Sequence, residues 1–141
     1  MNEAGRTTLL ARIPRRLRDF LCGRPEVIVD FEFRHGFFFV SVRNIGAKPA
    51  INVRVEFVPA FTGLAGAKSV PDLPLFRDLT YLAPDRRIET FVDTSVSYFE
   101  REQPTRIKMS VSYSDLDGGR FMDRFEHNLE IYREIGYIER L

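Results

Sequence analysis

The sequence predicts an all-β protein: an immunoglobulin-like antiparallel β-sandwich of about seven strands, preceded by an N-terminal amphipathic helix. Several short segments alternate apolar and polar side chains, which is the period of a half-buried strand. The 141 residues include 13 Phe and 5 Tyr, and aromatic side chains favour strands. Turn residues separate these segments, and nothing indicates the strand–helix alternation of a parallel sheet.

The first 25 residues form a basic arm, and residues 26–141 form the predicted β-domain. Apolar side chains in the arm recur at three- and four-residue steps, typical of an amphipathic helix that starts or kinks at Pro14. Six arginines against Glu3 and Asp19 give the arm a net charge of +4. The helix either packs on the β-domain or binds an anionic membrane surface or a partner. The arm residues expected to interact are Leu10, Ile13, Arg15, Arg16, Leu17 and Phe20.

The clearest structural signal is a pair of strands between Phe37 and Pro59. The second strand of the pair alternates strictly. The first alternates less cleanly, with one row of Phe38, Val40 and Val42 and another of Phe37, Phe39, Ser41 and Arg43. Gly46, between them, tolerates a positive φ, and Asn44 can bond its own downstream backbone, so we expect a turn. Residues 26–33 predict a preceding strand, joined to this pair by a tight connection as an antiparallel hairpin.

The remaining segments are shorter, and each has its own pattern. Residues 107–114 alternate perfectly and predict a strand with one wet face. Two alternatives stay open for residues 132–141, a strand extension or a short helix. The other expectations are a long loop at 59–74, strands at 75–82, 88–92 and 121–131, turns at 83–86 and 115–119, and a polar, irregular stretch at 93–104 with Tyr98 and Phe99 as packing anchors.

Three motifs resemble the CARDB-like and related immunoglobulin-like domains of prokaryotes. Val42-Arg43-Asn44-Ile45-Gly46 followed by Pro49-Ala50-Ile51-Asn52-Val53-Arg54-Val55 is similar to their "N-x-G … pA-x-n-V-x-V" signature. Leu82-Ala83-Pro84 is similar to their "L-x-P-G" turn, with Asp85 in place of Gly, and Tyr113-Ser114-Asp115 with Gly118 is similar to their "Y-x-D-x-x-G" hairpin. The resemblance covers residues 26–132. It implies a sandwich fold and a non-catalytic module, mostly found in exported or envelope proteins.

Composition and charge bound the classes of function. Basic and acidic residues nearly cancel, 21 against 20, so there is no global electrostatic case for nucleic acid as a partner. No stretch approaches the ~18 apolar residues of a membrane span, and no secretory signal is recognisable. The single cysteine, Cys22, is compatible with a reducing compartment. We expect a cytoplasmic protein, with attachment to the inner face of the membrane as the alternative.

The polar motifs predict neither a metal site nor a catalytic site, and no cofactor or small-molecule substrate is inferred. Asp115 and Asp117 lack the further oxygen ligands of a calcium loop. His35 and His127 belong to no metal-binding motif. Asp123 and His127 would share the inner face of one strand, so we expect a bulge that turns one of them to solvent. A small enzyme using this pair is the least favoured alternative, and we expect no enzyme.

The aromatic surplus points instead to an interaction surface. If Phe38 faces the core, Phe37 and Phe39 face outward, and Phe91 also has no place in an inward row. A contiguous exposed aromatic patch marks an interface, unless the N-terminal helix or the C-terminal tail covers it. We therefore predict a non-catalytic accessory module that binds a partner protein, or itself, through a sheet face or edge. The alternative is a peripheral membrane protein anchored by its basic helix.

Overall fold

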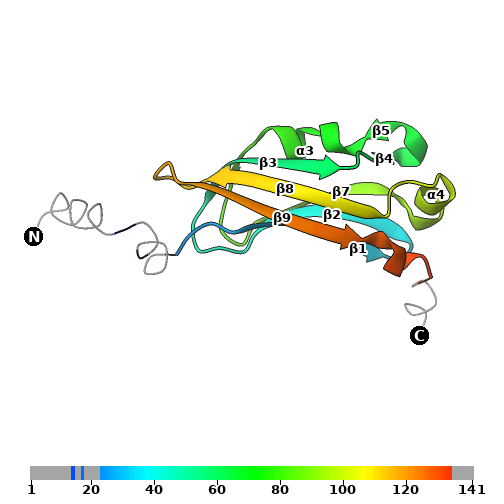
Figure 1. The fold of residues 1–141 in the computed structure, drawn as a ribbon, viewed down its shortest axis with the longest axis horizontal. Coiled ribbons are helices and arrows are strands. Elements are labelled where there is room, and N and C mark those ends of the chain that lie inside the picture. Colours follow the sequence, from blue (N-terminus) through cyan, green and yellow to red (C-terminus); the bar gives the residue numbers. More distant parts are fainter. Residues whose placement is uncertain (1–13, 15–16, 18–22, 135–141) are drawn as a thin grey trace, which may run out of the picture.

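The computed structural model describes residues 14, 17 and 23–134, which form two stacked antiparallel β-sheets (Figure 1). The strand orders are β1-β2-β7 and β6-β3-β8-β9. The bounds are β1 Val27–Arg34, β2 Phe37–Asn44, β3 Ala50–Val58, β6 Leu79–Leu82, β7 Arg87–Thr94, β8 Arg106–Ser114 and β9 Arg120–Asn128. The prediction of a mainly antiparallel β protein is confirmed.

The predicted N-terminal helix lies outside the described residues. This holds for Leu10, Ile13, Arg15, Arg16 and Phe20 of its expected contact set, while Leu17 is described and exposed. The structure therefore offers no support for that element.

The hairpin predicted at the start of the β-domain is present. β1 and β2 pair from Val27 opposite Asn44 to Arg34 opposite Phe37. The two residues between the strands, His35 and Gly36, have φ of 51° and 84°. Positive φ at both positions matches the right-handed twist of the two strands, which is the geometry of a two-residue type I′ turn.

The turn between β2 and β3 is built around a fully buried Asn44. Its Oδ1 accepts hydrogen bonds from the backbone N–H groups of Gly46 (2.9 Å) and Glu26 (3.1 Å). Its Nδ2 donates to the carbonyls of Lys48 (2.7 Å) and Leu82 (3.1 Å). The predicted role of Asn44 is thus confirmed, and the side chain also ties the turn to two other segments.

Gly46 does not use the positive φ that a glycine tolerates, since it is absent from the positive-φ glycines of the described chain. Glycine is needed there because the backbone of residues 24–26 passes close by. A Cβ at Gly46 would lie 2.2 Å from the Arg24 carbonyl oxygen and 2.5 Å from the Glu26 nitrogen.

β8 and β9 pair in one continuous register from Arg106 opposite Asn128 to Ser114 opposite Arg120. The bulge expected in the last strand is therefore wrong. Asp123 and His127 both lie on the half-buried face of β9. Each has a polar partner there, described below, so the strand needs no bulge to expose either of them.

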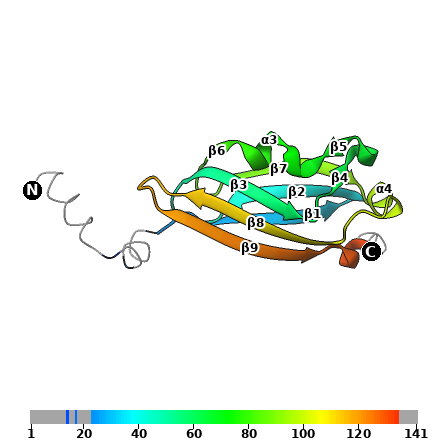
Figure 2. The same ribbon diagram turned by 45° about the horizontal axis from the view of Figure 1, so that its top comes forward.

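Residues 59–78 form an ordered excursion along one side of the two sheets (Figure 2). The buried side chains of Phe61, Val70 and Phe76 anchor it to the core. The strand predicted at 75–82 is correct only for β6, because its first half is a helix. The elements of the excursion are β4 Thr62–Gly63, η1 Leu64–Gly66, β5 Lys68–Ser69, η2 Val70–Asp72 and α3 Pro74–Arg77.

Two further short helices lie at the same end of the two sheets (Figure 1). α4, Ser95–Glu100, lies in the stretch expected to be irregular, and it buries the predicted anchor Tyr98. η3, Leu129–Tyr132, follows β9 and buries Leu129. The tail alternatives for 132–141 fall almost wholly outside the described residues.

The core between the sheets is largely aromatic. Phe31 of β1 contacts Phe57 of β3 and Phe61 of the excursion, with ring centroids 6.4 and 5.6 Å apart. Phe57 also meets Phe76 of α3 edge-on at 4.9 Å. Tilted and edge-on contacts of this kind stabilise beyond simple burial. Both sheets and the excursion thus share one core.

Candidate interaction surface

Three phenylalanines meet on the outer face of the β1-β2-β7 sheet, where a half-buried sheet would ordinarily present polar residues. Phe91 lies 5.8 Å from Phe37 and 5.7 Å from Phe39 between ring centroids. Phe37 is 44% exposed and Phe91 37%. The three residues predicted from sequence to face outward are therefore adjacent on one surface.

A register shift brings the cluster together. β2 and β7 pair with Phe39 opposite Phe91 and with Phe37 opposite Thr94, and the shift falls between Phe38 and Phe39. The extra residue on β7, Val92, points to the core. Because the bulged strand bends at such a point, Phe91 contacts both outward rings of β2.

Next to the phenylalanines, four charged side chains form a closed ring of ion pairs. Arg34 contacts Glu32 (2.9 Å) and Glu89 (2.7 Å). Arg87 contacts the same two carboxylates, Glu89 at 2.7 Å and Glu32 in close contact. Glu32 and Arg34 come from β1 and the other two from β7, so the ring spans the central strand β2, where Ser41 lies almost fully covered.

Arg34 connects the ion-pair ring to the aromatic cluster. Its guanidinium lies 4.1 Å from the centroid of Phe39, a favourable cation–π geometry. The hydrogen bond that Arg34 donates to Glu89 is the largest cause that lowers the pKa of this carboxyl below its ordinary value of 4.5, and the charge of Arg87 adds to it. We call these seven residues, Glu32, Arg34, Phe37, Phe39, Arg87, Glu89 and Phe91, the outer-face patch.

Sequence reasoning missed the four charged members of the outer-face patch. The hairpin turn at His35-Gly36 fixes Glu32 opposite Phe39 and Arg34 opposite Phe37, so two of them could have been found from the turn alone. Nothing local in the sequence places β7 beside β2, because that pairing joins segments far apart in the chain.

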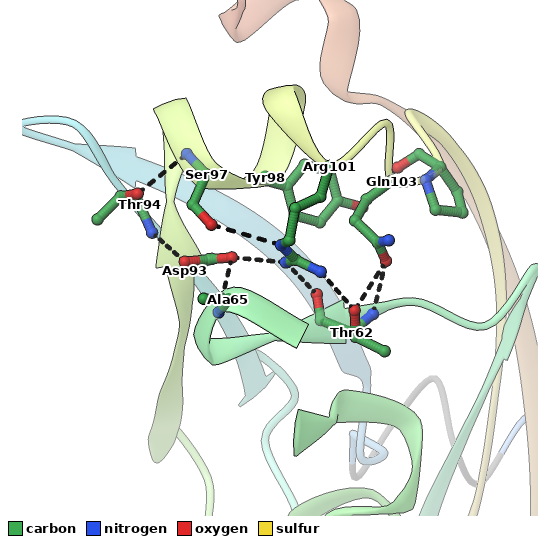
Figure 3. A network of polar contacts seen from close by, with 9 residues as sticks. Thr62, Ala65, Asp93, Thr94, Ser97, Tyr98, Arg101 and Gln103 are labelled. Carbon is green, nitrogen blue, oxygen red and sulfur yellow. Dashed lines mark hydrogen bonds and ion pairs between the residues drawn. The ribbon is translucent and has the colours of Figure 1, made fainter. Parts of the chain in front are cut away.

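A second polar constellation surrounds Arg101, just after α4 (Figure 3). Its guanidinium donates to Asp93 Oδ2 (2.5 Å) and to Thr62 Oγ1 (2.6 Å) and O (3.0 Å). Gln103 Oε1 accepts from the N–H of the same threonine at 2.8 Å. β7, the α4 segment and the excursion are therefore joined by one network.

This network is internally satisfied, which indicates a structural role. Burial by itself raises the pKa of Asp93, but hydrogen bonds from Arg101, from the N–H groups of Thr94 and Ala65 and from Ser97 outweigh it, and the pKa is lowered below 3.8. Asp93 thus stays a paired carboxylate at neutral pH. It is not poised to exchange a proton, as a general acid or base must be.

Asp123 and His127 do not form the pair that an enzyme would use. Asp123 Oδ2 accepts a hydrogen bond from the Tyr113 hydroxyl at 2.7 Å. His127 Nε2 lies 3.1 Å from the Val29 carbonyl oxygen, and its Nδ1 lies 3.8 Å from Asp30. The two side chains lie four residues apart on β9. Asp123 therefore contacts β8, whereas His127 contacts β1.

The remaining candidate motifs are turns and small clusters. Asp115 Oδ1 accepts from the N–H groups of Asp117 (3.0 Å) and Gly119 (2.7 Å), so the carboxylate shapes the β8–β9 turn. Among the described residues, no three His, Cys, Asp or Glu side chains gather in metal-binding distance. No helix in the described part of the chain is long and apolar enough to cross a membrane.

Comparison with known proteins gives one match. The model of a family described as "Domain of unknown function (DUF8453)" matches residues 7–133, which is most of the chain. No curated protein and no solved structure matches the sequence or the fold.

Proposed function

The chain belongs to the DUF8453 family, a domain of unknown function, and on that premise we propose that it is a non-catalytic module that binds a partner protein through the outer-face patch. The observation that carries this proposal is the cluster of Phe37, Phe39 and Phe91 on an exposed sheet face. Contiguous apolar surface of this kind is costly to leave in water and marks sites of association.

The ion-pair ring beside the cluster supports a specific interaction. Aromatic residues and arginine are enriched at the centres of protein interfaces. Here Arg34 and Arg87 are already held by Glu32 and Glu89, so a partner would not have to order these long side chains on binding. The patch thus combines apolar anchors with a preorganised polar border.

We also propose that the fold is immunoglobulin-like. The chain forms the β1–β2 hairpin, crosses to β3 and β6 in the other sheet, returns to β7 beside β2 and crosses again to β8 and β9. Greek-key sandwiches are connected in this way. The resemblance to CARDB-like domains stays a prediction that rests on the turn motifs alone.

Affinity capture tests the proposed function. The full chain would be used as bait in extracts of its source cells, beside Phe37→Ser/Phe91→Ser and the control Tyr81→Ser. Tyr81 is an aromatic residue of β6, 54% exposed. We expect a protein captured in stoichiometric amount by the wild type and the control, and lost with the double variant. Equal capture by all three chains, or capture of nothing by the wild type, would contradict the proposal.

A second candidate is attachment to an anionic membrane surface through the basic arm, favoured by its charge of +4 and its leucine-rich stripe. In this proposal residues 1–25 form the amphipathic helix and dock the module. Sedimentation with anionic vesicles, comparing the wild type with Arg15→Glu/Arg16→Glu, tests it. Binding that the charge reversal leaves unchanged would rule out this role of the arm.

A further inference from the structure

The two large sheets have four edge strands, and three of these are contacted by other elements or very short in the described structure. The excursion packs against β7 so closely that a Cβ on Gly63 would lie 2.2 Å from the Val92 carbonyl oxygen. His127 contacts the Val29 carbonyl at the β1 edge. β6 is only four residues long. Covered or very short edges are the usual means by which β proteins avoid pairing with other chains.

The fourth edge, β9, lacks these protections. It is nine residues long, keeps an unbroken register with β8, and contains no Gly, Pro or Lys. Between Met122 and Asn128, no described residue outside β8 exchanges a backbone hydrogen bond with it. An antiparallel strand uses only one side of its backbone for each neighbour, so between Met122 and Asn128 the other side of β9 has backbone donors and acceptors that no described residue uses.

We infer that β9 pairs antiparallel with β9 of a second copy of this chain, about a two-fold axis at Phe125. In that register Arg124 of each copy lies opposite Glu126 of the other on the outer face, and Met122 lies opposite Asn128. On the inner face Asp123 lies opposite His127, twice. Arg124 and Glu126 are therefore opposite in charge, Asp123 and His127 can share a hydrogen bond, and Met122 and Asn128 are uncharged.

Charge selects this register over its neighbours. Residues that oppose each other must lie on the same face of the sheet, so their sequence numbers differ by an even number. In every allowed register one residue is therefore opposite its own copy at the two-fold axis. An axis at Arg124 places two arginines opposite each other, one at Asp123 places two aspartates together, and one at Met122 sets Arg120 against Arg124. Like charges directly opposite are destabilising. Only the axis at Phe125 avoids such a conflict among these four.

The side chains of the proposed interface are available. Met122, Arg124 and Glu126 are exposed. Arg124 has no ion pair with any described residue, and Glu126 has only Arg106 at a distance of 4.0 Å. This edge belongs to the sheet opposite the outer-face patch, so self-association through β9 and partner binding through the patch are separate properties that can fail separately.

Sedimentation equilibrium of the full chain tests the inference through a charge swap. We expect a wild-type dimer, and Arg124→Glu should raise its dissociation constant by roughly tenfold or more, because two glutamates then face each other twice. The double variant Arg124→Glu/Glu126→Arg restores opposite charges across the two-fold axis. Its dissociation constant should return to within about threefold of the wild-type value.

Arg120→Glu is the matched control, since it makes the same charge change on the same strand outside the paired segment, and it should leave the dimer unchanged. Thermal melts of all variants verify that each is folded. A wild-type chain that is monomeric at about 1 mM, a concentration at which even weak association is detectable, would overturn the inference. So would equal weakening by Arg120→Glu and Arg124→Glu, or a double variant that stays as weak as Arg124→Glu.

Discussion

At the scale of single residues, Asn44 stabilises the fold more than its size suggests. Its four hydrogen bonds satisfy the backbone of the β2–β3 turn, of the segment before β1 and of β6. A buried amide with every donor and acceptor used in this way fixes the relative position of three segments. The sequence indicated only its bond within the turn, because Glu26 and Leu82 are distant in the chain.

Asn44→Ala should lower the free energy of unfolding by roughly 3 kcal/mol, because it leaves one buried and three partly buried backbone groups without their partners. Denaturant unfolding measures this loss. The neighbouring exposed Arg43, which pairs with Asp85 at the surface, provides the control. Arg43→Ala should cost at most about 1 kcal/mol. Similar losses for the two variants would contradict the assigned role of Asn44.

Asp93 makes the stability of the protein depend on pH. Its pKa in the folded chain lies below its ordinary value of 3.8, so the unfolded chain binds more protons between these two values. The stabilisation is therefore complete above pH 3.8 and is lost as the pH falls through the folded pKa. We expect the free energy of unfolding to fall more steeply in this acidic range for the wild type than for Asp93→Asn. Parallel profiles would show that this carboxylate contributes nothing.

At the scale of elements, the turns differ in why they need glycine. Gly36 adopts a φ of 84°, and a Cβ added there would have nothing within 4 Å, whereas Gly46 is in contact with neighbouring backbone. The first requirement is conformational and the second is steric. The sequence shows a glycine in both turns, but only the packing of residues 24–26 shows that a side chain at Gly46 would collide with the backbone.

Gly36→Ala should therefore cost about 1 kcal/mol, because a residue with a Cβ is strained in a left-handed backbone conformation. Gly46→Ala should cost more, because a Cβ there would lie 2.2 Å from a backbone oxygen that cannot move alone. Thermal melts of the two variants rank the effects. The reverse ranking would show that residues 24–26 can yield without loss of stability.

Among the elements, strands with one buried face are predictable from the sequence, whereas segments without a periodic pattern are not. Strict alternation identified β3 and β8 because each has one buried and one wet face. Residues 59–74 of the excursion were expected to be a loop, since their anchors Phe61 and Val70 follow no period. The bulge expected in β9 was wrong because alternation cannot show that an inward polar residue has a partner.

At the scale of the whole molecule, the phenylalanines fall into two groups, those that build the core and those that lie on an outer sheet face. Five are buried in the core and four more pack against it. Phe37, Phe39 and Phe91 lie outside that core on one sheet face. Their outward direction was predictable from the period of β2, but their contact was not, because it depends on the long-range pairing of β2 with β7 and on the register shift.

Hydroxyl-radical footprinting of the free full-length protein, with oxidation of each aromatic residue quantified by mass spectrometry, tests the central claim most directly. Phe38 and Phe76, at 1% and 0% exposure, provide the buried standards, and Tyr81 at 54% provides the exposed one. The proposed interaction surface predicts that Phe37 and Phe91 react at rates near that of Tyr81, and become protected when the captured partner is added. Oxidation of both in the free chain as slow as that of Phe38 would contradict it, because the chain itself would then cover the patch.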